Sequence, residues 1–449
     1  MNWLLPLLLI VLPSLLSLSY FSARFRELSV ISAASTLLLA IAINLLQIHE
    51  ADFFLIDSLS RLLILTVSAV YLLSTLFALG YHHSLGESRN MRLHLSMMHL
   101  FSASMLFSLA VNNYGLLWIG VEATTISSAL LLVIEEDALN VEAAWRYVII
   151  VSAGLAISLI SIIMIYSAFG TLEISQLLAR PHIFNATVEI AAATALIGFG
   201  TKIGLAPMHS WLPDAHSEAP SEISSMFSGV LLPVAVFALY RVYQITYGRS
   251  IEYLYIFFSL LTLVIVALLL PSQRYYKRMF AYSTMENMSL ILIGLVVGGI
   301  GYIGAVVLLV SHAFGKAGAF YSSGNILSIF KKKRMDEVAG LRSSMPQTSV
   351  TMLLSSLAVT GSPPFGTFVG EIFIFMAVIS NGFFAAAAVM ALTLLISFSS
   401  INLKVGRMVF SEPHDTKVTE ASLLQRSVAI VSVTMSAAVL LALLMVGGV

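Results

Sequence analysis

Five ionisable residues lie inside long apolar segments of this sequence. Glu122 lies in LLWIGVEATTISSALLL, and Lys202 lies in IGFGTKIGLAP. His312 and Lys316, four residues apart in SHAFGKAGAF, share one face of a helix. Glu371 lies in FVGEIFIF. A charge at the centre of a bilayer costs about 2.5–3.5 kcal/mol on insertion scales, so we expect these side chains to have a function.

Carboxyl and amino groups in such surroundings are suited to carrying protons. Removal from water favours the neutral form of both groups, and a nearby opposite charge restores the charged form. A moving charge or a change in hydration can then switch the proton occupancy. The alternative is a set of buried Glu–Lys pairs that only hold helices together, although such pairs stabilise proteins weakly.

Six further residues are candidates for relaying protons or for tuning the first set. They are Arg146, His209, Asp214, His216, Arg241 and Glu286. Arg146, in EAAWRYVII, could face Glu122 or could extend to the membrane interface. Glu286, in AYSTMENMSL, is predicted to lie near the cytoplasmic end of its helix.

A polar segment follows Lys202 and contains two histidines. His209 and His216 flank Trp211 and Asp214 in PMHSWLPDAHSEAP. Two histidines at this spacing are a weak signal for a metal site. We therefore interpret the segment as a polar cap or a proton entry path, and we expect Trp211 to lie in an interfacial aromatic belt.

The composition places all of these residues in an integral membrane protein. Of 449 residues, 59% are hydrophobic and 10% are charged, whereas soluble proteins contain about 25% charged residues. The sequence has no cysteine, which excludes disulfides and cysteine-ligated zinc or iron–sulfur clusters. We expect no cofactor, no metal and no catalytic centre in this chain.

The apolar runs predict an all-α polytopic fold with about fourteen transmembrane helices. The expected spans are 3–20, 29–48, 55–80, 93–111, 114–134, 143–169, 188–208, 221–247, 252–270, 280–298, 301–330, 347–379, 383–410 and 424–447. The first run could also be a signal peptide, but no basic residue precedes it, and we interpret it as a span.

Basic residues predict the orientation of the helices, because they concentrate in cytoplasmic loops. Seventeen fall on one predicted face: Arg24, Arg26, Arg89, Arg92, Arg146, Arg274, Lys277, Arg278, Lys331, Lys332, Lys333, Arg334, Arg342, Lys404, Arg407, Lys417 and Arg426. Four fall on the opposite face: Arg61, Arg180, Arg241 and Arg249. We expect the first face to be cytoplasmic and both termini to lie outside the cytoplasm.

The seventh and twelfth predicted helices are interrupted by residues that break helices. The seventh contains Gly204 and Pro207, and the twelfth contains Gly361, Pro363, Pro364 and Gly366. Proline removes a backbone donor, and unwound backbone at membrane depth occurs only where protein buries it or where it lines a cavity. Paired breaks predict two inverted five-helix repeats with a site at each break. Two unrelated kinks in a helical bundle are the alternative.

The predicted repeats divide the chain into four parts. Residues 1–89 hold the first three helices, 90–248 the first repeat with helices four to eight, 249–411 the second repeat with helices nine to thirteen, and 412–449 the last helix.

The segment KIGLAPMHSWLPDAHSEAPSEISSMFSGVLL resembles the signature of the antiporter-like subunits of respiratory complex I, Mrp antiporters and membrane-bound hydrogenases. The resemblance covers roughly residues 90–410, and KRMFAYSTMENMSL, SHAFGKAGAF and FGTFVGEIF also match the pattern of this family. Within the family, IGVEATT, VEAAWRYVII and YSTMEN are most similar to component F of hydrogenase-4-type complexes, which are energy-converting [NiFe] hydrogenases and formate hydrogenlyases.

The resemblance implies a subunit that carries protons, or sodium ions in some members, through a half-channel in each repeat. It assigns the ion path to Glu122, Lys202, His312, Lys316 and Glu371. It also implies partners in a prokaryotic cell membrane: other membrane-arm subunits, including further antiporter-like ones, and a peripheral redox arm. That arm would hold a [NiFe] centre and iron–sulfur clusters or a quinone.

One residue departs from the family pattern. Pro233, in SGVLLPVAVFALYR, occupies the position at which complex I subunits carry a lysine on the eighth helix. The link between the half-channels could then run through water, through His312 or through Arg241. Two alternative functions stay open, an Mrp-type Na⁺/H⁺ antiporter subunit and a scaffold whose channel has degenerated.

Overall fold

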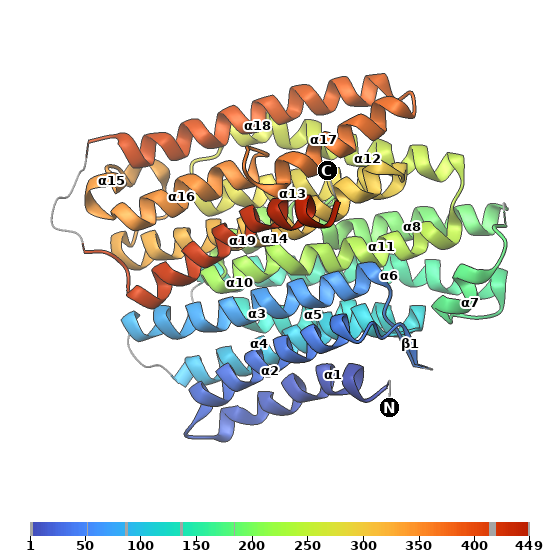
Figure 1. Ribbon diagram of the computed structural model, residues 1–449, viewed down its shortest axis with the longest axis horizontal. Helices are drawn as coiled ribbons and strands as arrows, with labels where there is room; N and C mark the ends of the chain where they lie inside the picture. Colours follow the sequence, from blue (N-terminus) through green and yellow to red (C-terminus); the bar gives the residue numbers. More distant parts are fainter. Residues whose placement is uncertain are drawn as a thin grey trace. The chain divides into compact units, whose positions relative to one another are not determined.

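The computed structural model describes residues 3–51, 53–85, 89–134, 138–183, 185–412 and 419–447. These residues are almost entirely helical, and Figure 1 labels most of their helices. A short antiparallel pair, β1 (Glu50–Ala51) and β2 (Phe54–Leu55), is the only sheet in the described ranges. Lys417, one of the basic residues that predict the orientation, lies outside them.

The helices that precede the first break are α1 (Leu4–Leu16) with a 3₁₀ turn (Ser17–Phe21), α2 (Phe25–Leu45), α3 (Ser58–Leu85), α4 (Arg89–Ala110), α5 (Tyr114–Val133), α6 (Ala138–Phe169), α7 (Ile174–Ala179) and α8 (Ala186–Ile203). Then follow α9 (Trp211–Glu218), α10 (Ser221–Met226), a π-helical segment (Phe227–Leu231), α11 (Leu232–Thr246), α12 (Arg249–Leu269) with a 3₁₀ turn (Leu270–Ser272), and α13 (Tyr276–Val297). The last are α14 (Ile300–Phe330), a 3₁₀ turn (Met335–Glu337), α15 (Leu341–Ser344), α16 (Pro346–Val359), α17 (Gly366–Ser380), α18 (Phe384–Phe410) and α19 (Leu423–Gly447).

The predicted membrane fold of about fourteen helices is confirmed. In the described part of the chain, thirteen helical segments are long and apolar enough to cross a membrane. The predicted twelfth span is present as two shorter helices, α16 and α17, on either side of its break. The other predicted spans each coincide with one of the thirteen.

Both predicted breaks are present. After α8, Gly204 takes a left-handed conformation with φ of 86°, which glycine adopts without steric cost. After α16, Gly361 takes φ of 63°. Pro207 and Pro364 each follow a cis peptide bond. The predicted eighth helix is also irregular, because its π-helical segment ends two residues before Pro233, which lies in the first turn of α11. Pro233 has no backbone N–H to donate, and the helical segment from Ser221 to Thr246 runs through it without a break.

The chain folds into two compact units, and each is assembled from separate segments. The first unit holds Met1–Thr75, Ser88–Trp211 and Val230–Ile256, and the second holds Leu76–Glu87, Leu212–Gly229 and Phe257–Val449. Within the described residues, the chain passes from one unit to the other inside helical segments, after Thr75 in α3, Trp211 in α9, Gly229 in the π-helical segment and Ile256 in α12. The inverted repeats and the four-part division of the chain therefore stay predictions.

Glycines bring the site-bearing helices of the first unit close together. A Cβ atom on Gly198 of α8 would lie 2.4 Å from the Cβ of Ser158 and 2.7 Å from the carbonyl oxygen of Gly154, both on α6. A Cβ on Gly154 would in turn lie 2.6 Å from the Cβ of Thr201. Small residues allow this close approach of membrane helices, and Thr201 precedes Lys202. The packing of α6 on α8 thus sets the position of the buried lysine.

We expect Gly198→Ala to destabilise the protein by about 1–3 kcal/mol, because the added methyl group must displace backbone of α6. The measurement is the thermal unfolding midpoint of the purified protein in detergent. Gly406→Ala is the matched control, because a Cβ at that helical glycine meets no described atom within 4 Å. Equal midpoints for the two variants would contradict the proposed role of the α6–α8 contact.

Candidate functional site

Lys202 lies in the last turn of α8, directly before the first break. Its side chain is fully buried. Its Nζ donates hydrogen bonds to Thr125 Oγ1 on α5, at 2.9 Å, and to Tyr147 Oη on α6, at 2.6 Å. Nζ also lies 4.9 Å from the centre of the Tyr147 ring, within the range of a cation–π contact. The direct partners of this ammonium are therefore two hydroxyl groups and an aromatic ring.

Glu122 supplies the negative charge near this lysine. It lies three residues before Thr125, and residues at that spacing are neighbours on a helix surface. Oε1 accepts a hydrogen bond of 2.7 Å from Ser152 Oγ on α6. Oε2 is buried and has no hydrogen-bond partner among the described residues. Glu122 acts electrostatically on Lys202. The site therefore combines a carboxylate that has one oxygen without a described hydrogen-bond partner and a buried ammonium.

Tyr147 is a site residue that the sequence analysis missed, although it lies in the quoted segment VEAAWRYVII. It is fully buried, and its Oη lies 2.8 Å from Ser128 Oγ. Its ring packs on Trp211, with the ring centres 4.7 Å apart. Its position within an apolar span is a weak signal: a buried tyrosine hydroxyl usually needs a partner, but the sequence does not show which residue that partner is.

Trp211 does not lie in an interfacial belt, and that prediction is wrong. The side chain is fully buried. Its Nε1 donates a hydrogen bond of 2.8 Å to the carbonyl oxygen of Thr201, in the last turn of α8, where the helix supplies few donors of its own. The indole therefore connects the broken end of α8 to the ring of Tyr147.

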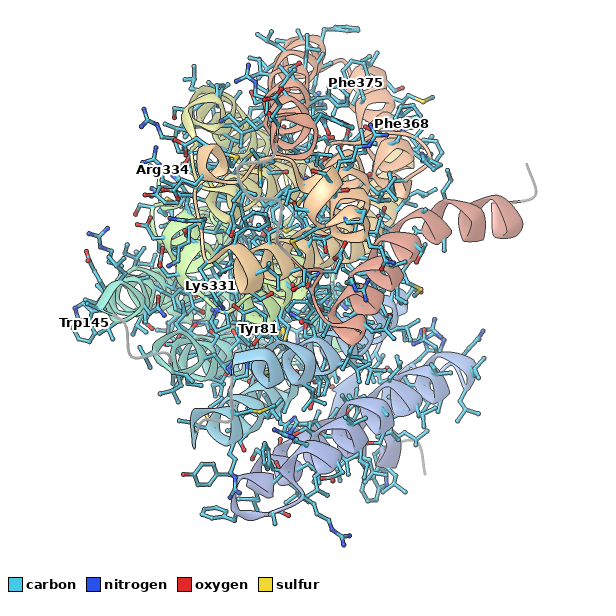
Figure 2. The ribbon with its side chains drawn as sticks, turned by 90° about the vertical axis from the view of Figure 1, so that its left-hand side faces the viewer. Tyr81, Trp145, Lys331, Arg334, Phe368 and Phe375 are labelled. Carbon is cyan, nitrogen blue, oxygen red and sulfur yellow. The ribbon has the colours of Figure 1, made fainter. Side chains whose placement is uncertain are left out.

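Arg146 lies at the surface of its unit. Its guanidinium forms an ion pair of 2.5 Å with Glu142, and both side chains are 55% exposed. The neighbouring Trp145 is 65% exposed and projects outward in Figure 2. An exposed tryptophan beside an exposed arginine is typical of a membrane interface. This geometry favours the interfacial alternative for Arg146.

Lys316 is the buried lysine of the second unit, on α14. Its Nζ donates a hydrogen bond of 3.0 Å to the carbonyl oxygen of Phe280 on α13 and lies 5.9 Å from the Phe280 ring. Glu286 is also buried and acts electrostatically on Lys316. Glu286 lies in the middle of α13, so the prediction that it lies near the end of its helix is wrong: α13 begins at Tyr276, earlier than expected.

His312 is connected to Lys316 by a chain of polar groups. A ring nitrogen of His312, Nε2, lies 3.2 Å from the carbonyl oxygen of Ser228 in the π-helical segment. Ser228 Oγ lies 2.6 Å from Thr284 Oγ1, which lies 2.9 Å from the carbonyl oxygen of Phe280. Lys316 donates to that same carbonyl. π-Helical turns are frequent at functional sites, and this one presents Ser228 to the histidine.

Glu371 packs against the second break. It lies in the second turn of α17, and a Cβ atom on Gly361 would come within 2.0 Å of its Oε2. The carboxylate therefore occupies the space that a side chain at position 361 would fill. Glu286 acts electrostatically on Glu371 as well as on Lys316, which places two carboxyl groups and Lys316 in one cluster.

The polar segment after the first break does not behave as one site. Asp214 forms an ion pair of 3.1 Å with Arg278. His216 is fully buried, and its ring stacks on Phe320 with the centres 5.3 Å apart. Burial, together with the positive charge of nearby lysines, lowers the pKa of His216 to about 3. Burial also lowers the pKa of His209. Within the described ranges, no three His, Asp or Glu residues are grouped as metal ligands.

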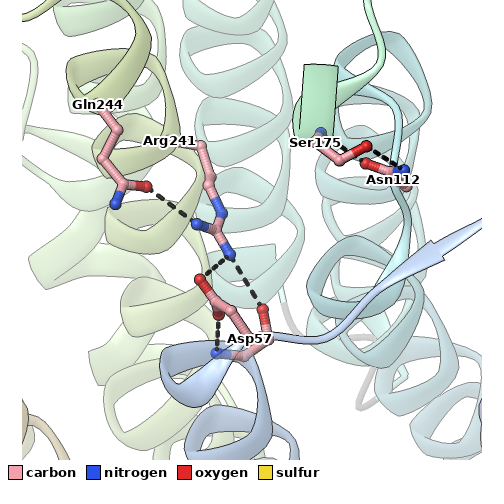
Figure 3. Close-up of polar contacts among 6 residues, drawn as sticks. Asp57, Asn112, Ser175, Arg241 and Gln244 are labelled. Carbon is pink, nitrogen blue, oxygen red and sulfur yellow. Dashed lines mark hydrogen bonds and ion pairs between the residues drawn. The ribbon is translucent and has the colours of Figure 1, made fainter. Parts of the chain in front are cut away.

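Arg241 is held in an ion pair at the start of α3. Its guanidinium lies 2.6 Å from Asp57 Oδ2, 3.3 Å from Ser60 Oγ and 2.9 Å from Gln244 Oε1. Figure 3 shows the side chains of Arg241, Asp57 and Gln244 pointing toward one another. Burial raises the pKa of Asp57, but the charge of Arg241 and the backbone amide of Ser60 outweigh it, so the pKa lies below its ordinary value. Arginine stays charged in proteins, and this pair fixes α11 to α3.

Known proteins share the sequence pattern and the fold of this chain. The family model described as NADH:quinone oxidoreductase/Mrp antiporter, TM matches residues 111–397. A hydrogenase-4 component F homolog from Methylacidiphilum infernorum is 30% identical over 382 residues, which is 81% of this chain and 80% of that protein. Two solved structures share the fold. A chain of the Mrp complex from Dietzia sp. DQ12-45-1b has a TM-score of 0.89 at 21% identity, covering 99% of this chain and 95% of its own. A chain of respiratory complex I from Thermus thermophilus has a TM-score of 0.86 at 22% identity, covering 97% and 95%.

We expect Gly361→Ala to impair the second site, because the new methyl group would collide with the Glu371 carboxylate. The left-handed backbone adds a strain of about 1–3 kcal/mol for a residue other than glycine. Gly382→Ala is the matched control, because Gly382 has φ of 82° and no described atom within 4 Å of a Cβ. The measurement is the thermal unfolding midpoint of both variants. Both carry the backbone strain, but only Gly361→Ala adds the collision with Glu371, so the difference between the midpoints reports the collision. A Gly361→Ala variant no less stable than Gly382→Ala would contradict the contact.

We expect Asp57→Asn to cost about 1–3 kcal/mol, because it leaves the Arg241 guanidinium buried without its counter-charge. The pKa of Asp57 lies below 3.8 in the folded protein. The contribution of the carboxylate is therefore fully present above its unfolded pKa and disappears as the pH falls through the folded value. The measurement is the unfolding midpoint at neutral pH. Asp336→Asn, in the exposed pair with Arg334, should change the midpoint little. Equal midpoints for the two variants would contradict the account.

Proposed function

Because the chain belongs to the NADH:quinone oxidoreductase/Mrp antiporter family, we propose that it translocates protons as an antiporter-like subunit of a redox-driven membrane complex. The relative with 30% identity is named as a hydrogenase-4 component, and this favours the membrane arm of an energy-converting [NiFe] hydrogenase or a related complex I-like enzyme. The resemblance to the hydrogenase-4 component favours a prokaryotic cell membrane, and the distribution of basic residues favours both termini outside the cytoplasm.

The environment of Lys202 is the observation that carries the proposal. A lysine that only held helices together would be expected to pair directly with a carboxylate. Here the ammonium is bonded to two neutral hydroxyl groups, and the nearby Glu122 keeps one oxygen without a partner among the described residues. In this arrangement Lys202 can gain or lose a proton without breaking a salt bridge. The change in its charge alters the electrostatic potential at Glu122.

The cluster of the second unit supports a second half-channel. His312, Lys316, Glu286 and Glu371 are joined there by hydrogen bonds or by electrostatic interaction. Each unit thus combines a buried lysine with a carboxyl group and a broken helix. This is the arrangement expected if inverted repeats each provide half of an ion path.

The ion pair of Arg241 with Asp57 argues against this arginine as the link between the half-channels. His312 is the better candidate, because it contacts the π-helical segment at Ser228. The helical segment that contains Ser228 enters the first unit at Val230. We propose that this segment takes the place of the lysine that Pro233 replaces.

The energy for transport must come from partner subunits. Moving one charge across 100 mV requires about 2.3 kcal/mol. We propose that a peripheral arm with a [NiFe] centre and iron–sulfur clusters or a quinone supplies this energy. Further membrane-arm subunits would pass it to this chain as a rearrangement of charge in the membrane plane.

The test is redox-driven proton uptake in sealed vesicles that contain the whole purified complex. We expect Lys202→Ala to keep redox turnover and to lose the proton gradient, because the first path no longer holds a proton. Lys332→Ala, at an exposed lysine, is the control and should pump as the native complex does. Equal pumping by native and Lys202→Ala complexes would favour a scaffold. Uptake of sodium instead of protons would favour the Mrp-type alternative.

A further inference from the structure

An apolar groove runs between α16 and α19, two helices of the second unit that lie side by side in Figure 1. The groove has a volume of about 430 Å³, and the residues that line it include Gln347, Val350, Thr351, Leu354, Ile430 and Thr434. Both helices begin on the face that we propose to be cytoplasmic, α16 at Pro346 and α19 at Leu423. A helix rises 1.5 Å per residue, so the groove extends about 10 Å along α16 from Gln347 to Leu354.

The wall of this groove below Gln347 suits hydrocarbon. Its two threonines use their hydroxyl hydrogens within their own helices. The hydroxyl of Thr351 lies 3.0 Å from the carbonyl oxygen of Thr348, and the hydroxyl of Thr434 lies 2.7 Å from that of Ile430. The other lining side chains there are aliphatic. A polar ligand would lose its hydrogen bonds to water on such a wall, so the occupant of this part is apolar, as the acyl chain of a lipid is.

Two side chains of opposite charge bond to Gln347 at the mouth of the groove. Glu420 Oε1 accepts a hydrogen bond of 2.7 Å from the backbone amide of Gln347. Arg426 Nη1 donates one of 2.8 Å to Gln347 Oε1. Within the described ranges, neither Glu420 nor Arg426 is part of an ion pair. The mouth therefore presents a positive and a negative charge, each without a counter-charge from the described chain.

Both charged groups keep capacity for further hydrogen bonds. Arginine has five N–H donors, and Arg426, which is partly exposed, uses one of them on a described residue. A carboxylate accepts about four hydrogen bonds. Glu420, also partly exposed, accepts from the amide of Gln347 and from the amide and the hydroxyl of Thr348. A ligand that carries both an anion and an N–H cation can therefore bond to both groups at once.

We propose that the groove binds a phospholipid with a zwitterionic amino headgroup, of the phosphatidylethanolamine class. Its acyl chain lies between α16 and α19, its phosphate accepts hydrogen bonds from Arg426, and its ammonium donates to Glu420. Basic pockets between transmembrane helices bind lipid headgroups in other proteins, and here the carboxylate selects among lipids. A choline headgroup has no N–H to donate to Glu420, and an anionic headgroup without an ammonium is repelled by it. A neutral quinone makes no use of the charge pair.

The experiment is photo-cross-linking of the whole purified complex in phosphatidylcholine nanodiscs. These contain a small share of phosphatidylethanolamine with a photoactivatable acyl chain, and peptide mass spectrometry locates the label. We expect label on the α16 and α19 segments that line the groove. Arg426→Gln and Glu420→Gln should each reduce it about threefold, because a partly exposed charge pair contributes modestly to binding. Arg407→Gln and Glu337→Gln remove exposed charges elsewhere in the chain and should be labelled as the native complex is.

The headgroup comparison decides between occupants. Equal labelling of the groove by a matched phosphatidylcholine probe would overturn the amino headgroup, and stronger labelling by a phosphatidylglycerol probe would replace it with an anionic one. Absence of lipid label, with a neighbouring subunit cross-linked to the groove instead, would show that protein fills it. If Glu420→Gln does not assemble, the three probes on the native complex still give the answer. Lipid binding here does not depend on whether Lys202 carries protons, so either result leaves the proposed function to its own test.

Discussion

The cost of burying the Lys202 ammonium is the constraint on which the first unit depends. An ammonium removed from water must be hydrogen-bonded, or it gives up its proton. Thr125 and Tyr147 provide the acceptors. They come from α5 and α6, so both helices must pack tightly on α8. The glycine contacts between α6 and α8 provide that closeness. At the break after Lys202, the Thr201 carbonyl accepts hydrogen bonds from the indole of Trp211 and from the backbone amide of Gly204.

The second unit also buries a lysine ammonium, and different groups bond to it there. Its lysine, Lys316, donates to a backbone carbonyl instead of to two hydroxyls, and Glu286 supplies the opposite charge. Glu371 fits against Gly361 because the break leaves room for its carboxylate. A broken helix therefore has two uses in this chain. It exposes backbone groups that side chains can bond, and it makes space for a charged side chain at membrane depth.

Much of this fold could be predicted from the sequence, because a membrane requires long apolar helices and makes charges conspicuous. Lys202 and Glu371 were recognisable for that reason, as were the breaks beside them. Tyr147 was not, because a tyrosine in an apolar span looks like any packing residue until the hydroxyl's partner is known. The pairing of Arg241 with Asp57 joins residues far apart in sequence, which no local pattern reveals. The sequence predicted Trp211 to lie at the membrane interface. Its hydrogen bond to the end of α8 depends on the path that the chain takes after Gly204, and the sequence does not show that path.

The central claim is that Glu122 responds to a change in the protonation of Lys202 during turnover. Redox-induced infrared difference spectroscopy of the reconstituted complex tests it directly, because protonated and ionised carboxyl groups absorb at different frequencies. The account predicts a carboxyl signal that disappears in Glu122→Gln and is lost or displaced in Lys202→Ala. A carboxyl signal that is identical in the native complex and in both variants would contradict it.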